Sequence, residues 1–404
     1  MNIVIYAGDN KYYKTLLPVV KEIKRRGHTY LFLYCKDTSL RFPQQKDRFA
    51  YDGNFPDQEE NVISETLGLR IPFKPDLLLL ARECWQPEQS IIYEFKTKFS
   101  AKIGLVEVSS HLVNNIENRL EMLSRMQPPQ NMIDYYFEHS EFAKDRRIDC
   151  MDENYRDKIK VVGNPRFTDI KLTEGLGKYH IDSSKEHILF WGVINTTRDT
   201  ALKALEVLAE KTKDTHQIFY KCYPGEPSNP KFKNQFNPFV VKNVQVIYDE
   251  DDIFDIASLC DTHIGQMSSI FNFAFYYDKK IVNLDSVCRA SERMNDLDTF
   301  INETGNGVED SAKFWMRIWN IPTIEEFKEF IGLDRITTFN KTNKEVTAIV
   351  SEYTLDFDWD CKFISKPKKD YGKLLTLFDE YEFDKKAPVR IVNILEDEHL
   401  CRHR

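Results

Sequence analysis

Hydrophobic residues in the first part of the chain alternate between short continuous runs and a stretch of helical spacing. Residues 2–6 and 30–34 are short apolar runs, and between them apolar residues from 16 to 23 recur at helical intervals before Gly27. Short apolar runs predict buried strands, a period of about 3.6 residues predicts an amphipathic helix, and glycine is favoured just after a helix ends. The opening therefore predicts a strand–helix–strand unit.

The same alternation continues through the first half. The apolar runs at 77–80 and 103–108 are continuous rather than alternating, which is typical of parallel strands covered on both faces. Another strand is expected at 158–162, and a polar stretch with scattered glycines follows over 169–184. Such a stretch is typical of a linker. We therefore expect an N-terminal domain that spans residues 1–175.

The pattern starts again in the second half. A strand is expected at 187–191, and Leu202, Leu205 and Leu208 then form one face of a helix. Further strands are expected at 217–220, 244–247 and 280–284. Strands that alternate with helices in both halves predict an α/β protein with two doubly wound domains.

The order becomes less regular toward the C-terminus. We expect the second domain to span 176–320 and residues 321–404 to form a helical or irregular extension that packs on the domains. Thr323 and Glu326 have capping-box spacing before the amphipathic stretch 324–331, which predicts a helix there.

Composition agrees with two folded domains. The chain has 404 residues, of which 42% are hydrophobic and 30% charged, and chains beyond about 250–300 residues usually divide into domains. Its formal net charge of −8 argues against a general nucleic-acid binder, which needs an excess of Lys and Arg. The eight cysteines include no Cys-x-x-Cys pair, so we expect free thiols in a reduced compartment, no metal site and no other cofactor.

The location of the protein is suggested by its first residues and its hydropathy. The chain begins directly with an expected strand, without the features of a secretion signal, and no apolar run reaches the roughly 18–20 residues that cross a membrane. We therefore expect a cytoplasmic protein. A basic and aromatic cluster allows peripheral contact with anionic lipid at the inner face of the membrane, with a solvated surface as the alternative. It consists of Lys366, Lys368, Lys369, Lys373, Phe363 and Tyr371.

Two adjacent serines are the first candidates for binding chemistry. Ser268 and Ser269 stand just before the stretch 270–277, which is expected to be helical. A helix start presents unpaired N–H groups and the positive end of the helix dipole, and serine hydroxyls add donors without bulk, so the pair suits a phosphate. Ordinary capping of the helix by serine is the alternative.

Two loops that follow expected strands belong to the same group. Ligands of open α/β sheets bind beyond the carboxyl ends of the strands, and the loops at 192–197 and 221–226 follow the strands at 187–191 and 217–220. An ordinary connecting turn is the alternative for both. The candidate donor-binding residues in these loops are Gly192, Asn195, Lys221, Tyr223, Pro224 and Glu226.

These motifs, in this order, resemble the C-terminal half of GT-B glycosyltransferases. The pattern is Lys-x-Tyr-Pro-x-Glu at 221–226, an acidic segment at 248–252, and Ser-Ser-x-x-Asn followed by Asp-Lys-Lys-Ile-Val over 268–282. It is most similar to the group of CDP-glycerol glycerophosphotransferases and CMP-dependent Kdo and sialic acid transferases. Those enzymes usually have a histidine where this chain has Tyr223. The junction at 162–165, Val-Gly-Asn-Pro, also recurs in related enzymes.

The resemblance implies two facing Rossmann-like domains with a cleft between them. The C-terminal domain would bind the nucleotide donor, and the N-terminal domain would receive the acceptor and supply the base that removes a hydroxyl proton. Among residues near expected strand ends we prefer Asp9, in the first turn, and Glu107, at the end of a buried strand; a solvated or paired side chain is the alternative for each. The other candidates are Glu83, Glu88 and His111.

The resulting functional hypothesis is an inverting glycosyltransferase of polysaccharide biosynthesis. It would move a sugar from a cytidine-activated donor to a surface-glycan or lipid-linked glycan acceptor, and inversion is expected because no Glu-x₇-Glu pattern is evident around Ser268. The alternatives are a UDP-sugar transferase, a UDP-sugar 2-epimerase of the same fold, and a non-catalytic protein that binds a sugar nucleotide.

A metal-dependent mechanism is not expected. Asp358 and Asp360 are separated by one residue, as in carboxylate pairs that bind Mn²⁺ or Mg²⁺. They follow two complete α/β patterns, however, and alternating polarity also suits a solvated strand. We therefore expect a metal-independent enzyme.

Overall fold

The computed structural model describes residues 1–8, 10–35, 49–55, 61–81, 86–108, 132–150, 153–168, 176–177, 179–192, 198–222, 243–247, 253–266, 271–288, 316, 320–331 and 348–400. They form two compact units: the first holds the described residues of Met1–His111, Glu121–Asp169 and Thr376–Arg404, and the second those of Ile170–Leu375. Each unit has a mainly parallel sheet packed against helices. The predicted α/β class with two Rossmann-like domains is confirmed.

The first unit contains a seven-stranded sheet in the order β3-β2-β1-β6-β7-β8-β9. Neighbouring strands are parallel except for the antiparallel pair β2–β3. The strands are β1 (Asn2–Ala7), β2 (Thr29–Cys35), β3 (Phe49–Asn54), β6 (Leu77–Leu80), β7 (Lys102–Val106), β8 (Tyr135–Glu138) and β9 (Ile159–Val161), with a separate antiparallel hairpin of β4 (Val62–Ser64) and β5 (Leu69–Ile71). The helices are α1 (Asn10–Arg25), α2 (Gln86–Lys98), α4 (Glu141–Cys150) and α15 (Ala387–Leu400), with short turns η3 (Glu153–Lys158) and η4 (Pro165–Phe167).

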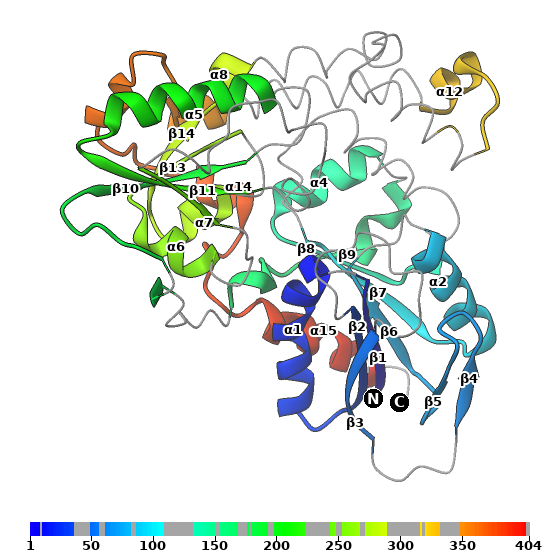
Figure 1. Ribbon diagram of the computed structural model, residues 1–404. Coiled ribbons are helices and arrows are strands. Elements are labelled where there is room, and N and C mark those ends of the chain that lie inside the picture. Colours follow the sequence, from blue (N-terminus) through cyan, green and yellow to red (C-terminus); the bar gives the residue numbers. More distant parts are fainter. Residues whose placement is uncertain are drawn as a thin grey trace. The chain divides into compact units, whose positions relative to one another are not determined.

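Strand β1 shows how both faces of this sheet are covered. Ile3 and Ile5 belong to a core that includes residues of α1 and α15, whereas Val4 and Tyr6 belong to a second core that includes residues of α2. Successive side chains of a strand point to opposite faces, so a strand covered on both sides is apolar throughout. Figure 1 shows α1 and α15 on one side of the sheet and α2 on the other.

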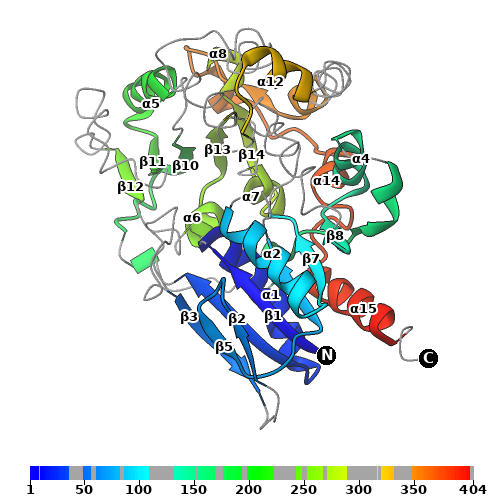
Figure 2. The same ribbon diagram turned by 90° about the vertical axis from the view of Figure 1, so that its right-hand side faces the viewer.

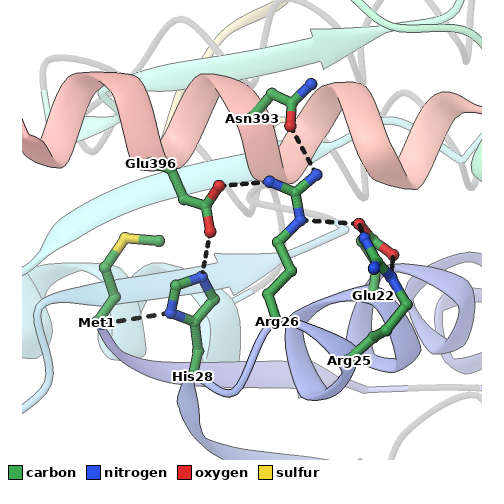
Figure 3. A network of polar contacts seen from close by, with 7 residues as sticks. All are labelled: Met1, Glu22, Arg25, Arg26, His28, Asn393 and Glu396. Carbon is green, nitrogen blue, oxygen red and sulfur yellow. Dashed lines mark hydrogen bonds and ion pairs between the residues drawn. The ribbon is translucent and has the colours of Figure 1, made fainter.

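Polar contacts fix α15 beside α1 (Figure 3). Arg26, just after α1, forms an ion pair with Glu396 and donates from Nη2 to Oδ1 of Asn393 at 2.6 Å. The Nε2 atom of His28 lies 2.8 Å from Oε1 of the same Glu396. Glu22 accepts from Arg26 at 2.8 Å, and its hydrogen bonds with Arg25 and Arg26, opposed by partial burial, lower its pKa to about 2. The end of the chain thereby becomes part of the first unit.

The second unit contains a six-stranded parallel sheet in the order β12-β11-β10-β13-β14-β15. The strands are β10 (Glu186–Trp191), β11 (His216–Lys221), β12 (Val244–Ile247), β13 (Thr262–Gly265), β14 (Lys280–Asn283) and β15 (Leu355–Asp356). The helices are α5 (Arg198–Thr212), α6 (Ile253–Leu259), α7 (Phe271–Tyr276), α8 (Asp285–Cys288), α12 (Ile324–Ile331) and α14 (Leu374–Phe378), the last running into the first unit, with one short turn, η8 (Lys362–Ser365).

Both faces of the second sheet are also buried. Ile188 and Phe190 pack in a core with apolar residues of α5. Trp191, which alternates with them along β10, packs against Phe273 of α7 with ring centroids 5.3 Å apart. Figure 2 shows the strands of this sheet with α5, α6 and α7 around them.

Several strands are not predicted by the sequence pattern, namely β3, β8, β13 and β15 together with the β4–β5 hairpin. β8 shows why, because its residues Tyr135–Glu138 end in a charged side chain that is fully buried. The strand is defined by pairing with β7 and β9 on either side, which local periodicity does not reveal. By contrast, the helix expected at 324–331 has the predicted bounds, and Glu326 N–H donates to Oγ1 of Thr323 at 3.2 Å.

The C-terminal part of the chain divides between the two units. Described residues up to Leu375 belong to the second unit and those from Thr376 onward to the first. The expected domain limits 1–175, 176–320 and 321–404 stay predictions.

The basic cluster near the C-terminus places its aromatic members in the interior. Phe363 is fully buried, and Tyr371 is 3% exposed, with its hydroxyl donating to the carbonyl of Lys279. Lys368 forms an ion pair with Asp278. Within the part of the chain that the structure describes, no helix is both long and apolar enough to cross a membrane.

A pH dependence follows from the His28 contact with α15. Burial and the positive Met1 amino group lower the pKa of His28 below 6.5, although Glu396 acts in the opposite direction. The folded protein therefore favours the neutral imidazole, whereas the unfolded protein binds a proton more readily. The stability that neutral His28 contributes is fully present above pH 6.5 and is lost as the pH falls through the pKa of His28 in the folded protein. Lowering the pH from about 7.5 to 5.5 should therefore reduce the free energy of unfolding less in His28→Gln than in the wild type, as measured by urea titrations at each pH.

The matched control is His180→Gln, because His180 is solvent-exposed. It should keep the pH dependence of the wild type. An identical pH dependence in His28→Gln and wild type would contradict the prediction.

Candidate functional site

The carboxyl ends of the second sheet's strands form a continuous edge. Gly192 N–H donates to the carbonyl of Lys221 at 2.8 Å, which joins the ends of β10 and β11. Leu284 N–H donates to the carbonyl of Gly265 at 2.8 Å, which joins the ends of β14 and β13. The predicted loops after β10, β11 and β13 therefore leave the sheet at one edge, where ligands of open α/β sheets bind.

Lys221 ends β11 with its charged group in the interior. Its side chain is 7% exposed, and Nζ donates to the carbonyl of Cys222 at 3.0 Å. An ammonium group held at a sheet edge in surroundings of low polarity attracts anions more strongly than one in water. The donor-binding role of Lys221 stays a prediction.

Trp191 and His263 lie side by side behind this edge, with ring centroids 6.1 Å apart. His263 is fully buried, its Nε2–H donates to the carbonyl of Ala257 at 3.0 Å, and burial lowers its pKa to about 4. The imidazole is therefore neutral near pH 7. The Trp191 indole N–H is buried and has no hydrogen-bond partner among the described residues.

Asn272 is the asparagine of the Ser-Ser-x-x-Asn motif, although it was not among the candidate donor-binding residues. It lies in α7, is 2% exposed, and its Oδ1 has no hydrogen-bond partner among the residues described. An unsatisfied buried polar atom costs about 1–3 kcal/mol, so such atoms call for a ligand, water or protein partner. The signal available in the sequence was its place in that motif, four residues after Ser268.

Most of the predicted donor-binding residues fall outside the described residues. Gly192 and Lys221 are placed at the sheet edge, as given above. The donor-binding residues outside them are Asn195, Tyr223, Pro224, Glu226, Ser268 and Ser269. Three of the base candidates, Asp9, Glu83 and His111, also lie outside the described residues.

Glu107, one of the two preferred bases, lies in a buried charge network of the first unit. Its side chain is 1% exposed; Oε2 accepts from Nη2 of Arg147 at 2.6 Å and Oε1 from Val108 N–H at 2.9 Å. Arg147 also forms an ion pair with Glu138, and its guanidinium lies 4.8 Å from the ring centroid of Tyr136. One cation thus holds two carboxylates that follow or end neighbouring strands.

His139 completes this network next to β8. It is fully buried, and its Nε2 lies 2.9 Å from the carbonyl oxygen of Glu107. A carbonyl only accepts hydrogen bonds, so the ring proton is on Nε2. Nδ1 has no hydrogen-bond partner within the described residues. The network is a compact, mostly satisfied arrangement that orients the ends of β7 and β8.

Glu88 lies at another strand end of the first unit. It belongs to the first turn of α2, is 6% exposed, and a Cβ on Gly8 would come within 2.9 Å of its Oε1 atom. Because Gly8 has no side chain, the Glu88 carboxylate can lie close to the backbone just after β1.

The aspartates considered for metal binding have local partners. Asp360 pairs with Lys211 at 3.3 Å and Lys362 at 3.1 Å, and Asp358 accepts from Lys362 N–H at 3.0 Å. Among the described residues, no group of three or more His, Cys, Asp or Glu side chains could hold a metal ion.

Removal of the shared cation tests whether the first unit depends on it. Arg147→Met leaves Glu107 and Glu138 buried without their partner, and we expect the free energy of unfolding to fall by about 3–5 kcal/mol in urea titrations. Arg25→Met is the control, because Arg25 pairs with Glu22 but its side chain is 67% exposed, and it should change stability little. Equal, small effects of both substitutions would show that the buried network contributes little.

Comparison with known proteins finds solved structures whose fold is similar to that of this chain. No family model and no curated protein matches the chain. A solved structure of S. aureus MnaA with UDP is 16% identical, with 98% of this chain and 96% of that chain covered and a TM-score of 0.54. UDP-GlcNAc 2-epimerase from Neisseria meningitidis bound to UDP-GlcNAc is 13% identical, with coverages of 87% and 100% and a TM-score of 0.48. A glycosyltransferase from Rickettsia africae is 16% identical, with coverages of 88% and 94% and a TM-score of 0.42.

At these identities the likeness shows the fold alone. The likeness to the MnaA structure supports the predicted fold of two Rossmann-like domains. It does not support the narrower resemblance to the CDP-glycerol and CMP-sugar group.

Proposed function

We propose that this chain is an enzyme that binds a UDP-sugar at the carboxyl edge of its second sheet. The observation that carries the proposal is the fold likeness, over nearly the whole of both chains, to a protein solved with UDP. Trp191 ends β10 at that edge, and its indole N–H, like Oδ1 of Asn272 in α7, is buried without a hydrogen-bond partner among the described residues. Buried polar groups normally have partners, which supports a ligand near Trp191.

The proposal replaces the cytidine donor expected from the sequence. That expectation came from the resemblance of the Lys-x-Tyr-Pro-x-Glu and Ser-Ser motifs to cytidine-dependent enzymes, although Tyr223 stands where those enzymes usually have histidine. Both motifs suit the diphosphate of a nucleotide without specifying its base. The fold likeness to a UDP-bound protein therefore favours uridine.

In the proposed site, cationic and hydroxyl groups would hold the diphosphate. Ser268 and Ser269 stand between β13 and α7, and Lys221 ends the strand two places away in the sheet. Their donors would stabilise negative charge as the nucleotide leaves, which is the chemistry shared by sugar transfer and by epimerisation through nucleotide departure. Whether the sugar goes to a glycan hydroxyl or returns as its epimer depends on the base and the acceptor.

For the base we propose Asp9 rather than Glu107. The Glu107 carboxylate is buried and bonded to Arg147, so proton exchange with a substrate would require that ion pair to open. In the sequence Asp9 follows Gly8, the residue just after β1 that the buried Glu88 carboxylate approaches. In this proposal Glu107 orients the strand ends and Asp9 performs the proton transfer.

Nucleotide binding is the primary test. UDP should raise the melting temperature of the protein more than CMP, CDP or GDP, because a ligand that binds the native state alone stabilises it. The double variant Ser268→Ala, Ser269→Ala should lose most of that shift with an unchanged far-UV circular dichroism spectrum.

Ser184→Ala is the control, because Ser184 precedes β10 and contacts Asp182 away from the carboxyl edge. It should keep the full UDP shift. Stabilisation by cytidine nucleotides but not by UDP would overturn the donor assignment, and no shift with any nucleotide would overturn the proposed function.

Turnover separates the enzyme from a binding protein and Asp9 from Glu107. With UDP-GlcNAc as donor, Asp9→Asn should abolish both UDP release and epimer formation while the UDP-induced shift remains. Glu107→Gln should retain turnover in the fraction that is folded. Full turnover by Asp9→Asn would exclude Asp9 as the base, and UDP binding without any turnover by the wild type would favour a non-catalytic protein.

A further inference from the structure

An open pocket of about 570 Å³ lies on the first unit, between α2 and the turn that joins β4 to β5. Its α2 wall includes Gln89, Ser90, Tyr93 and Thr97, which share one face of the helix at the spacing expected for a helical surface. The volume falls in the range of about 300–1,000 Å³ that is usual for small-molecule sites. The strand ends discussed above do not contribute to it.

Helix α2 does not need this face for its packing. Ile91, Ile92 and Phe95 point to the core and are at most 2% exposed. Tyr93, between them in the sequence, is 60% exposed and lines the pocket. A large aromatic ring is thus held in solvent on a helix that is anchored from its opposite side.

The opposite wall is fixed to α2 by one buried carboxylate. Glu94 accepts from Ser64 Oγ at 2.8 Å, from Glu65 N–H at 2.8 Å and from Thr66 N–H at 3.1 Å. Burial alone would raise the pKa of Glu94, but these hydrogen bonds lower it. The turn is therefore held in place before a ligand arrives, which reduces the entropy lost on binding.

The charges in the pocket disfavour an anion. Lys98 is the cation among the pocket-lining residues, and its Nζ already lies 3.2 Å from Glu65, 3.7 Å from Glu94 and 2.9 Å from the carbonyl of Ile63. With two carboxylates and one engaged ammonium, the pocket offers no excess positive charge for a phosphate or sulfate.

The remaining groups match a neutral sugar. A pyranose has a face of C–H groups that packs on an aromatic ring and a rim of hydroxyls that both donate and accept hydrogen bonds. The exposed Tyr93 ring offers the first. The Ser90 hydroxyl offers the second by donating and accepting. The Thr97 hydroxyl donates to the Tyr93 carbonyl and the Thr66 side chain hydrogen-bonds to Glu94, so the oxygens of these two hydroxyls add acceptors to the rim. We infer that this pocket is a binding site for a neutral carbohydrate, separate from the UDP-sugar site proposed above.

Ligand-observed NMR on the full-length protein tests this inference. Saturation transfer is measured to maltotetraose, chitotetraose and xylotetraose, with a heparin tetrasaccharide as the anionic comparison, each at about 1 mM. At least one neutral oligosaccharide should receive saturation, and the heparin fragment should not. Tyr93→Ala should weaken binding about tenfold, and Ser90→Trp, which fills the pocket, should abolish it.

Tyr51→Ala is the matched control, because Tyr51 is a 68%-exposed tyrosine on β3, outside the pocket. It should bind like the wild type. No transfer to any neutral oligosaccharide, stronger binding of the heparin fragment, or unchanged binding by Tyr93→Ala would each overturn the inference. UDP-induced stabilisation is measured separately, so the failure of either proposal is recognised independently of the other.

Discussion

The need to cover both faces of a parallel sheet is the constraint on which the first unit depends. Because β1 pairs in parallel with strands on both sides and its side chains alternate between two apolar cores, helices must pack on each face. One cover is completed by α15, which comes from the end of the chain and is fixed to α1 through Arg26 and Glu396. The other is α2, whose outer side remains exposed and carries Tyr93.

Burial also decides the state of charged groups near the strand ends. Glu107 and Glu138 lie where water is excluded, and a carboxylate there is strongly destabilising unless it is paired. Arg147 pairs both of them. This is why a carboxylate whose place in the chain suits a catalytic base is better explained as an orienting residue, and why we assign proton transfer to the turn after β1.

The two proposals give the chain two kinds of ligand with different chemistry. In the first proposal, Lys221 and the two serine hydroxyls would suit the diphosphate of a nucleotide sugar. At α2, an exposed aromatic ring with neutral polar groups suits an uncharged glycan. A nucleotide-sugar enzyme with a separate glycan site could hold a polymer while it acts on activated sugars, which keeps the local concentration of a bound chain high.

The sequence by itself determined the alternation of strands and helices, and therefore the α/β class and the two Rossmann-like units, because apolar runs and helical periodicity are local properties. It also located Gly192 and Lys221, since loops after parallel strands share one edge. Tertiary structure decided which distant parts of the sequence meet: β8 as an internal strand with a buried Glu138, the pairing of Glu107 with Arg147, and the return of α15 to the first unit. It also revealed the burial of Asn272 and the pocket at Tyr93. These depend on which side chains burial brings together, and a local pattern does not encode that.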